Sequence, residues 1–128
     1  MNAQAPTERR PSRRALLVLA GLIALASWGS GWWVQRQARV AGKALAALVR
    51  TGDIELVSSL DCVYCAQARD WLTAQGVPFT ECLIERDAVC AARYQALLQP
   101  GTPVVLVRGQ AQLGFSPERV RQRLLKSG

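Results

Sequence analysis

Two cysteines three positions apart are the residues with the clearest capacity for chemistry in this sequence. Cys62 and Cys65 are the second and last residues of the stretch DCVYC. Thiols at this spacing can hold a metal ion, form a permanent crosslink or exchange electrons through a reversible disulfide. The sequence contains no histidine, which excludes Cys/His catalysis, Ser/His/Asp triads and mixed Cys/His zinc sites. The cysteines therefore carry most of the functional signal.

The residues around this pair predict a strand followed by a helix. Ile54–Ser59 is short, apolar and partly β-branched, as expected of a buried strand, and Cys62–Gln75 has an apolar stripe at helical spacing. Cys62 then lies at the first helical turn, where free N–H groups and the helix dipole favour a nucleophilic thiolate. Cys65 lies one turn further on and can reach the first sulfur. The neighbouring charge of Asp61 acts mildly against ionisation.

Further along the chain, strand-like and helix-like patterns alternate. They predict a strand, a helix, a hairpin of two strands and a last helix, at Phe79–Ile84, Ala88–Leu98, Pro103–Val107, Gln110–Leu113 and from Ser116-Pro117 onward. The inner face of the second helix is expected to hold Cys90, Tyr94, Leu97 and Leu98. The order β-α-β-α-β-β-α predicts an α/β fold with a mixed four-stranded sheet, in which the first two strands are parallel and the hairpin is antiparallel.

The positive charge of the sequence is confined to its N-terminal part. Of the formal charge of +7, residues 1–50 contribute all, with eight Lys or Arg and one acid, whereas residues 51–128 have eight of each sign. The second part therefore lacks the basic footprint of a nucleic-acid-binding domain. Cations beside an apolar segment are typical of membrane topology signals.

Residues 15–35 contain no charged side chain, and as a helix 20 of them span about 30 Å, the thickness of a bilayer's hydrocarbon core. Trp28, Trp32 and Trp33 follow at the end of this stretch, where indole rings favour the membrane boundary. We therefore expect a single-span anchor in the inner membrane of a bacterium. A cleaved signal peptide, with Ala24-Leu25-Ala26 as its cleavage site, is the alternative and would leave a soluble periplasmic protein.

These observations predict four parts: a basic cytoplasmic tail (1–14), the anchor or signal peptide (15–35), a helical stalk or linker (36–52) and a folded domain (53–128). Both interpretations of the apolar segment place the domain outside the cytoplasm. In a bacterium this is the oxidising periplasm, where cysteine pairs are used as disulfides.

The domain resembles a glutaredoxin, within the thioredoxin superfamily, over residues 53–126. The matching features are C-x-Y-C at residues 62–65, GVPF at residues 76–79, Thr102-Pro103 and Gly114-Phe115. The resemblance implies a thioredoxin-like (glutaredoxin-type) fold and a thiol–disulfide oxidoreductase that requires no dissociable cofactor. It also implies the role of each site residue. Cys62 is the nucleophile and Cys65 the resolving thiol; Pro103 is cis and faces them; Thr102 and Tyr64 position the substrate; and Gly114 and Phe115 contact the substrate or glutathione.

The sequence departs from the family at three places. Val63 replaces a typical proline, Ser59 replaces a basic residue that helps to hold glutathione, and the Gly-Gly and acidic cluster is reduced to LGFSP at residues 113–117. The resemblance therefore supports dithiol chemistry with thiol or disulfide partners more firmly than it supports glutathione binding.

The second cysteine pair, Cys82 and Cys90, leaves three alternatives open: a structural disulfide, two buried free thiols, or a relay that exchanges electrons with the first pair. Its spacing is too wide for the usual Cys₄ zinc site, so no protein-bound metal is expected there. A soft metal such as Cu(I) on Cys62 and Cys65 remains an alternative function, as does a non-catalytic, anchored interaction domain. The direction of electron flow is not specified by the sequence.

Overall fold

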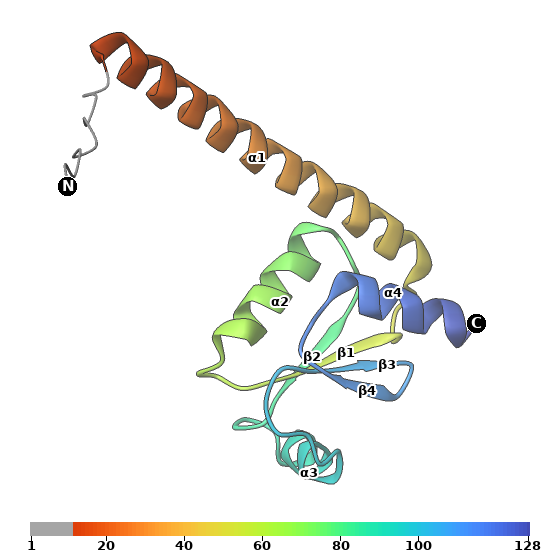
Figure 1. Cartoon of the computed structure of the whole chain (residues 1–128). Coiled ribbons are helices and arrows are strands. Elements are labelled where there is room, and N and C mark those ends of the chain that lie inside the picture. Colours follow the sequence, from red (N-terminus) through yellow and green to blue (C-terminus); the bar gives the residue numbers. More distant parts are fainter. Residues whose placement is uncertain (1–11) are drawn as a thin grey trace, which may run out of the picture. The chain divides into compact units, whose positions relative to one another are not determined.

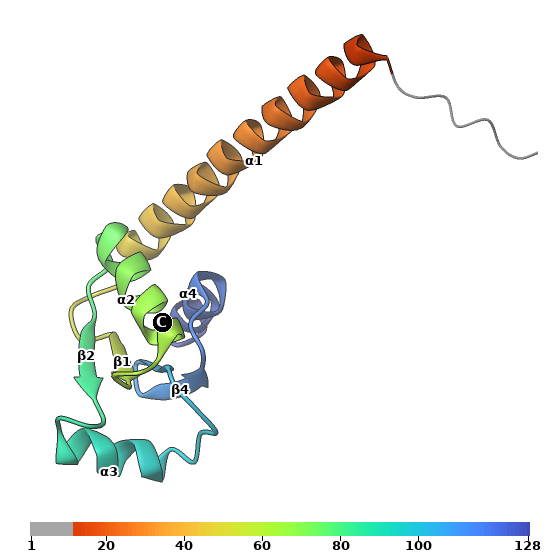
Figure 2. The ribbon, with the colours of Figure 1, turned by 90° about the vertical axis from the view of Figure 1, so that its left-hand side faces the viewer.

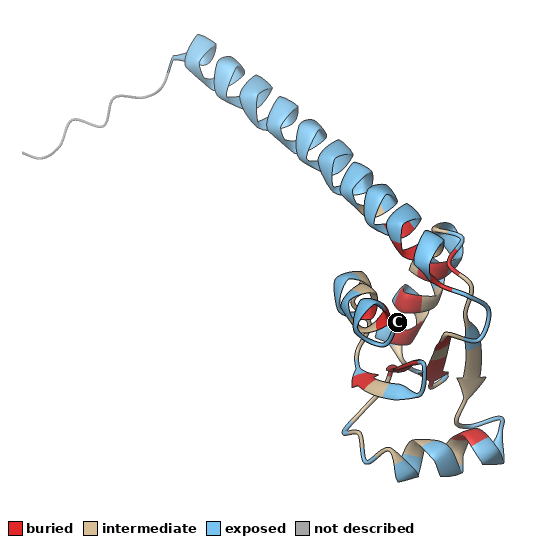
Figure 3. Ribbon diagram, turned by 90° about the vertical axis from the view of Figure 1, so that its right-hand side faces the viewer, coloured by how far each residue is buried: buried red, intermediate tan, exposed pale blue. Residues whose placement is uncertain are grey.

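The computed structural model describes residues 12–128, in which a long helix, α1 (Arg13–Leu48), precedes a small α/β domain (Figure 1). The predicted basic tail lies largely outside the described residues. The chain divides into two compact units, and the second begins at Gln37. In the first unit the side chains of α1 are exposed (Figure 3). Among residues 12–128, α1 is the one helix long and apolar enough to cross a bilayer, with a mean hydropathy of 1.7 over its most apolar window. A signal sequence near the N-terminus also meets this criterion of length and hydropathy.

The second unit is organised by a mixed sheet of four strands, β1 (Ile54–Ser58), β2 (Thr80–Leu83), β3 (Val104–Val107) and β4 (Gln110–Leu113). The order across the sheet is β2-β1-β3-β4. Strand β1 is parallel to β2 and antiparallel to β3, and β3 is antiparallel to β4. This thioredoxin-like arrangement confirms the predicted fold class.

Three helices complete the domain, and each follows its N-cap residue directly. Helix α2 (Val63–Ala74) follows Cys62, α3 (Ala88–Ala96) follows Asp87 and α4 (Pro117–Lys126) follows Ser116. The carboxylate of Asp87 accepts the N–H groups of Val89 and Cys90 at 2.8 and 3.1 Å, as an N-cap residue should. Helices α2 and α4 cover one face of the sheet, and α3 covers the other (Figure 2).

One expectation about α3 is wrong. Leu98 was placed on the inner face of this helix, but its side chain is 88% exposed. The helix ends at Ala96, and Leu98 has a positive φ of 51°, which turns the chain away from the direction of the helix. The side chains of Cys90, Tyr94 and Leu97 do pack in the cluster beneath α3.

The hydrophobic core has two parts, one on each face of the sheet. The larger part lies under α2 and α4 and contains Ile54, Leu56, Leu72, Val105 and Val120 among others, and the smaller part, under α3, contains Val57, Cys90, Val104 and Leu106. Alternate residues of β1 and β3 thus enter opposite cores, as the pleat of a strand dictates. Both faces of the central strands are buried by helices, which explains their continuous apolar sequences.

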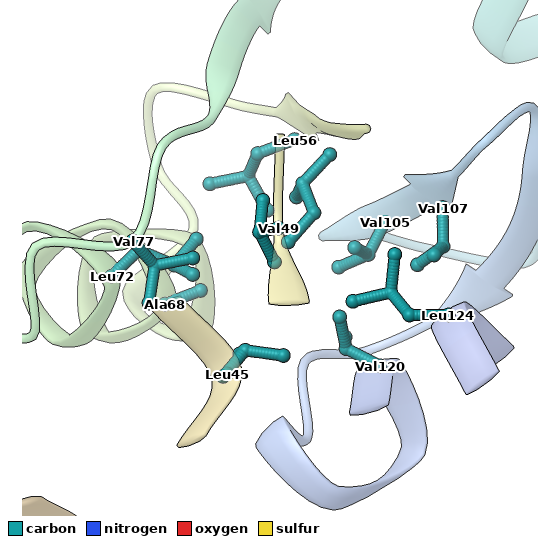
Figure 4. Packing of buried hydrophobic residues seen from close by; sticks show 11 residues of the cluster. Leu45, Val49, Leu56, Ala68, Leu72, Val77, Val105, Val107, Val120 and Leu124 are labelled. Carbon is teal, nitrogen blue, oxygen red and sulfur yellow. The ribbon is translucent and has the colours of Figure 1, made fainter. Parts of the chain in front are cut away.

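The last turns of α1 belong to this folded unit. Leu45 is fully buried and Val49, just after the helix, is 7% exposed; both lie in the larger core cluster with Leu72 and Val120 (Figure 4). Gly42 is buried against the side chain of Gln75, which would have to move to admit a Cβ atom at this position. Residues 36–52, expected to form a stalk or linker, are helical as far as Leu48. The second compact unit, which contains the α/β domain, begins at Gln37.

Because Leu45 fills the core, Leu45→Ala should lower the free energy of unfolding of the domain by about 2–5 kcal/mol, the range for truncating a buried leucine. Leu48→Ala is the matched control, because Leu48 is 37% exposed on the same helix and its truncation should have a much smaller effect. Thermal or denaturant unfolding of the full-length protein in a non-ionic detergent measures both. Equal effects would show that α1 does not contribute to the core.

An ion pair joins α2 to the edge strand β2. The guanidinium of Arg69 donates to both carboxylate oxygens of Glu81, each at 2.7 Å. These hydrogen bonds lower the pKa of Glu81 below its ordinary value, and partial burial opposes them. The pair lies one turn beyond Cys65 and fixes the helix against the sheet.

A carboxyl group whose pKa is lower in the folded than in the unfolded state contributes stability above its unfolded pKa, and this contribution is lost as the pH falls through the folded pKa. Glu81→Gln should therefore reduce stability at pH 7 by about 1 kcal/mol, the upper end for partly exposed pairs, and should weaken the dependence of stability on pH below about 4.5. Unfolding curves between pH 7 and pH 3 measure both effects. The control is Glu118→Gln, in a more exposed pair with Arg121 on α4; an equal loss in the two variants would contradict a special contribution of Glu81.

Candidate active site

The first cysteine pair forms a disulfide at the start of α2. The Cα atoms of Cys62 and Cys65 are 5.2 Å apart. Cys62 is the N-cap residue, and its Sγ atom accepts the backbone N–H of Cys65 at 3.1 Å. Cys62 is partly exposed, whereas Cys65 is fully buried. An incoming thiol can therefore reach the sulfur of Cys62 and not that of Cys65.

The position of Cys62 also favours the reduced, charged form of its sulfur. The N–H of Cys65 already points at this sulfur, and the N-terminal end of α2 adds the positive end of the helix dipole. Both stabilise a thiolate relative to a thiol, which lowers a cysteine pKa. The exposed carboxylate of Asp61, immediately before Cys62, acts in the opposite direction.

A groove of about 490 Å³ begins beside the disulfide. One wall is a stripe of α2, formed by Tyr64, Gln67, Ala68 and Trp71; the other wall and the floor are formed by Gly101, Thr102, Pro103, Leu113, Gly114, Phe115 and Pro117. The rings of Trp71 and Phe115 pack at 5.4 Å between centroids. None of the lining residues carries a charge. The groove therefore offers an apolar, neutral surface to whatever approaches Cys62.

The structure brings the site residues proposed from the sequence to one place. Tyr64, Thr102, Pro103, Gly114 and Phe115 all line this groove, although they come from three separate segments of the chain. The Thr102–Pro103 peptide bond is cis, as the resemblance implied. The carbonyl of Pro103 accepts the N–H of Gly114 at 2.8 Å, so that the proline loop and the loop before α4 are held together.

Several groove residues were not found from the sequence. Trp71 was interpreted as a core residue; it packs against the core, but it also forms part of the groove. Its spacing from Tyr64 and Ala68 places all three on one stripe of α2, and this spacing could have indicated its second role. Gln67, Leu113 and Pro117 gave no comparable signal.

Cys82 and Cys90 form the second disulfide, with a Cα–Cα distance of 6.0 Å. This selects the first of the three alternatives for the pair. Cys82 pairs with Val57 across the sheet and lies on the α3 side, whereas Cys65 lies on the α2 side. The sheet separates the two disulfides, so the fold does not allow direct exchange between them.

A carboxylate holds the loop that carries Cys62. Glu85, just after β2, accepts the hydroxyl of Ser59 and, at 3.2 Å, the backbone N–H of Leu60. The Ser59 hydrogen bond is the main cause that lowers the pKa of Glu85 below its ordinary value. The N–H of Ile84 also donates to the carbonyl of Ser58 at 3.1 Å. Sequence reasoning missed Glu85, because a lone acid in a loop gives no local signal.

No metal-binding group of three or more His, Cys, Asp or Glu occurs among residues 12–128. Among the described residues, Cys62 and Cys65 are the only cysteines on the face of the sheet that α2 covers. What their arrangement provides is one accessible sulfur, one buried partner and a hydrogen-bond donor for a negative charge on the accessible sulfur.

Comparisons with known proteins agree with this geometry. Residues 54–111 match the family model of glutaredoxin. No curated protein matches the chain. The thioredoxin-like protein BC3987 is 31% identical, over 56% of this chain and 97% of that one, with a TM-score of 0.45. The glutaredoxin-like protein NrdH-redoxin from Escherichia coli is 23% identical, over 54% of this chain and 91% of that one, with a TM-score of 0.48.

The family match covers the segment from β1 to β4, which contains both cysteines of the first pair and the cis-proline loop. Together with the observed fold and the redox-capable pair at the start of α2, it supports thiol–disulfide oxidoreduction as the general activity. The chain therefore contains a glutaredoxin-like domain with a thioredoxin-like fold.

Proposed function

We propose that this protein is a membrane-anchored thiol–disulfide oxidoreductase that exchanges disulfides with thiol or disulfide partners, chiefly proteins, on the periplasmic side of a bacterial inner membrane. The observation that carries the proposal is the asymmetry of the first pair. Cys62 is partly exposed and hydrogen-bonded by the N–H of Cys65, whereas the sulfur of Cys65 is buried behind it.

In the reducing direction, the thiolate of Cys62 attacks one sulfur of a substrate disulfide. A mixed disulfide with Cys62 forms, and the first substrate sulfur leaves as a thiolate and takes up a proton. Cys65 then loses its proton and attacks the sulfur of Cys62; the Cys62–Cys65 disulfide forms and the second substrate sulfur leaves as a thiol. Two electrons pass from the dithiol to the substrate. The oxidising direction reverses each step.

The groove supplies the surface on which a substrate is positioned. It is lined by Tyr64 and Trp71 from α2, by the cis-proline loop at Thr102 and Pro103, and by Gly114 and Phe115 before α4. A polypeptide segment beside a disulfide presents apolar side chains and backbone, which an uncharged groove can accept without burying an unpaired charge. This supports protein partners, with no dissociable cofactor in the exchange.

The first unit of the chain supports the anchor. Its side chains from Ala15 to Val34 are exposed on a helix of membrane-spanning length. The guanidinium of Arg36 lies 5.2 Å from the ring of Trp32, an arrangement suited to the membrane–water boundary, where both residue types are frequent. The second disulfide suits an oxidising compartment such as the periplasm.

Cys65→Ala should trap mixed disulfides between Cys62 and its partners, because the resolving thiol is lost while the accessible sulfur remains. In the native host, non-reducing gels should show adducts that disappear on reduction and are absent from the double variant Cys62→Ser/Cys65→Ala. Mass spectrometry of the adducts identifies the partners. If no adduct depends on Cys62, the exchange mechanism is wrong.

Alkaline phosphatase fused after Gly128 should be active in a bacterial host, because this enzyme requires the oxidising periplasm to form its own disulfides. The protein should remain in the membrane fraction after alkaline carbonate extraction, and its mass should correspond to the uncleaved chain. A fluorescent protein that matures only in the cytoplasm, fused at the same residue, is the control and should stay dark. A soluble, shortened product would support signal cleavage instead, and an inactive phosphatase fusion would reverse the orientation.

A further inference from the structure

The loop that carries Cys62 is held by a side chain with a negative charge. Glu85 accepts hydrogen bonds from the side chain of Ser59, three residues before Cys62, and from the backbone of Leu60, two residues before it. A neutral side chain could hold the same loop. The negative charge of Glu85 can therefore affect which molecules approach the sulfur of Cys62.

Glu85 is not the only acid near this sulfur. Asp61 is adjacent to Cys62, and both carboxylates are exposed. Arg86 follows Glu85 but is itself followed by Asp87, so residues 85–87 carry a net charge of −1 and Asp61 brings the total to −2. The groove lining contributes no charge. The cation of Arg119 lies beside the groove, where its Nη1 atom donates to the carbonyl of Leu113 at 3.3 Å, next to Gly114.

The second disulfide fixes the position of Glu85. Cys82 and Cys90 close a short loop, with a sequence separation of 8, and Glu85 lies within it. The backbone hydrogen bond from Ile84 to Ser58 attaches the start of the same loop to the end of β1. The disulfide and the hydrogen bond of Ile84 thus both restrain the segment that contains Glu85, and its carboxylate is held beside the loop of Cys62.

We infer that Glu85 is a specificity-determining residue that makes the site disfavour negatively charged thiols and disulfides and favour neutral or cationic ones. The inference rests on the proposed exchange at Cys62 and names the class of partner for it. A charge on the incoming molecule that lies close to its reacting sulfur meets the field of Glu85 and Asp61. Anionic small thiols, to which glutathione belongs, are repelled, and segments rich in Lys or Arg beside a cysteine are attracted.

Three thiols of similar size test this inference: cysteamine (cationic), 2-mercaptoethanol (neutral) and 3-mercaptopropionate (anionic). Their charges lie close to the sulfur, so they report on the surroundings of Cys62 rather than on Arg119. Each thiolate attacks Cys62, releasing the thiolate of Cys65; a second thiol then breaks the mixed disulfide, giving a small-molecule disulfide and the reduced pair. Two thiols are oxidised for each protein disulfide reduced.

The experiment uses the oxidised full-length protein in non-ionic detergent at low salt. Initial rates are followed by acid quenching, alkylation and mass spectrometry of the peptide that contains Cys62 and Cys65, so that any reaction of the second disulfide is scored separately. The measured quantity is the ratio of the cysteamine rate to the mercaptopropionate rate. Comparing this ratio between variants cancels the intrinsic reactivity of each thiol.

Glu85→Gln removes the charge but keeps an oxygen that can accept the N–H of Leu60. We expect it to lower the cation-to-anion ratio about fourfold, because a unit charge several ångströms away in water changes the rate roughly twofold for each unit of charge on the incoming thiolate, and the two thiolates differ by two units. The difference between variants should shrink in 1 M salt. The rate with 2-mercaptoethanol, whose reacting thiolate carries one negative charge, should rise by an intermediate factor, a graded pattern that loosening of the loop would not produce.

Asp70→Asn is the matched control, because Asp70 is an exposed carboxylate on α2 with no ion pair among the described residues. It should leave the ratio unchanged. If Glu85→Gln leaves the ratio of the cysteamine rate to the mercaptopropionate rate unchanged while 2-mercaptoethanol still reacts fast, the role of Glu85 in specificity is wrong. The proposed exchange at Cys62 would stand in that case. A neutral-thiol reaction no faster than exchange with a free small-molecule disulfide would instead count against the proposed function.

Discussion

The hydrogen bond from the N–H of Cys65 to the sulfur of Cys62 is the interaction around which the site is built. It exists because Cys62 is the N-cap residue of α2, with an extended backbone and a side chain that turns back over the first helical turn. A helix start leaves N–H groups without partners, and here a sulfur takes the place of the usual serine or aspartate oxygen. The sulfur that caps α2 is therefore the same atom that performs the exchange. The stability of the helix start and the reactivity of Cys62 are linked for this reason.

The rest of the domain keeps this helix start in position. Strand β1 leads directly into it, and the fully buried side chains of β1 and α2 fix the angle between the two elements. Arg69 and Glu81 tie the helix to β2, Glu85 holds the connecting loop, and the carbonyl of Pro103 joins the loops on the opposite wall. Helix α1 adds Leu45 to the same core, so the last turns of the helix whose first part is apolar and exposed also support the fold of the domain.

The sequence was sufficient to predict the elements and the main chemistry, because their signals are local. Asp87, Ser116 and Gly76 mark helix ends through capping and turn preferences, and the strands are short apolar runs. The resemblance to a known family was needed to place Thr102, Pro103, Gly114 and Phe115 in one site. Two features could not be predicted: Leu45 has the same surroundings in the sequence as its exposed neighbours on α1, and Glu85 acts through contacts with residues about 25 positions away. Such contacts depend on tertiary structure, which a single sequence does not display.

The two disulfides also have a consequence for the biosynthesis of the protein. Four cysteines can pair in three ways, and the observed pairing joins each cysteine to its nearest neighbour along the chain, with separations of 3 and 8. A polypeptide that emerges from its N-terminal end exposes Cys62 and Cys65 before Cys82, and Cys82 before Cys90. Short loops close at a small entropic cost, so the order of emergence itself favours the correct pairing. A protein built in this way can acquire its native disulfides without a helper that reshuffles them.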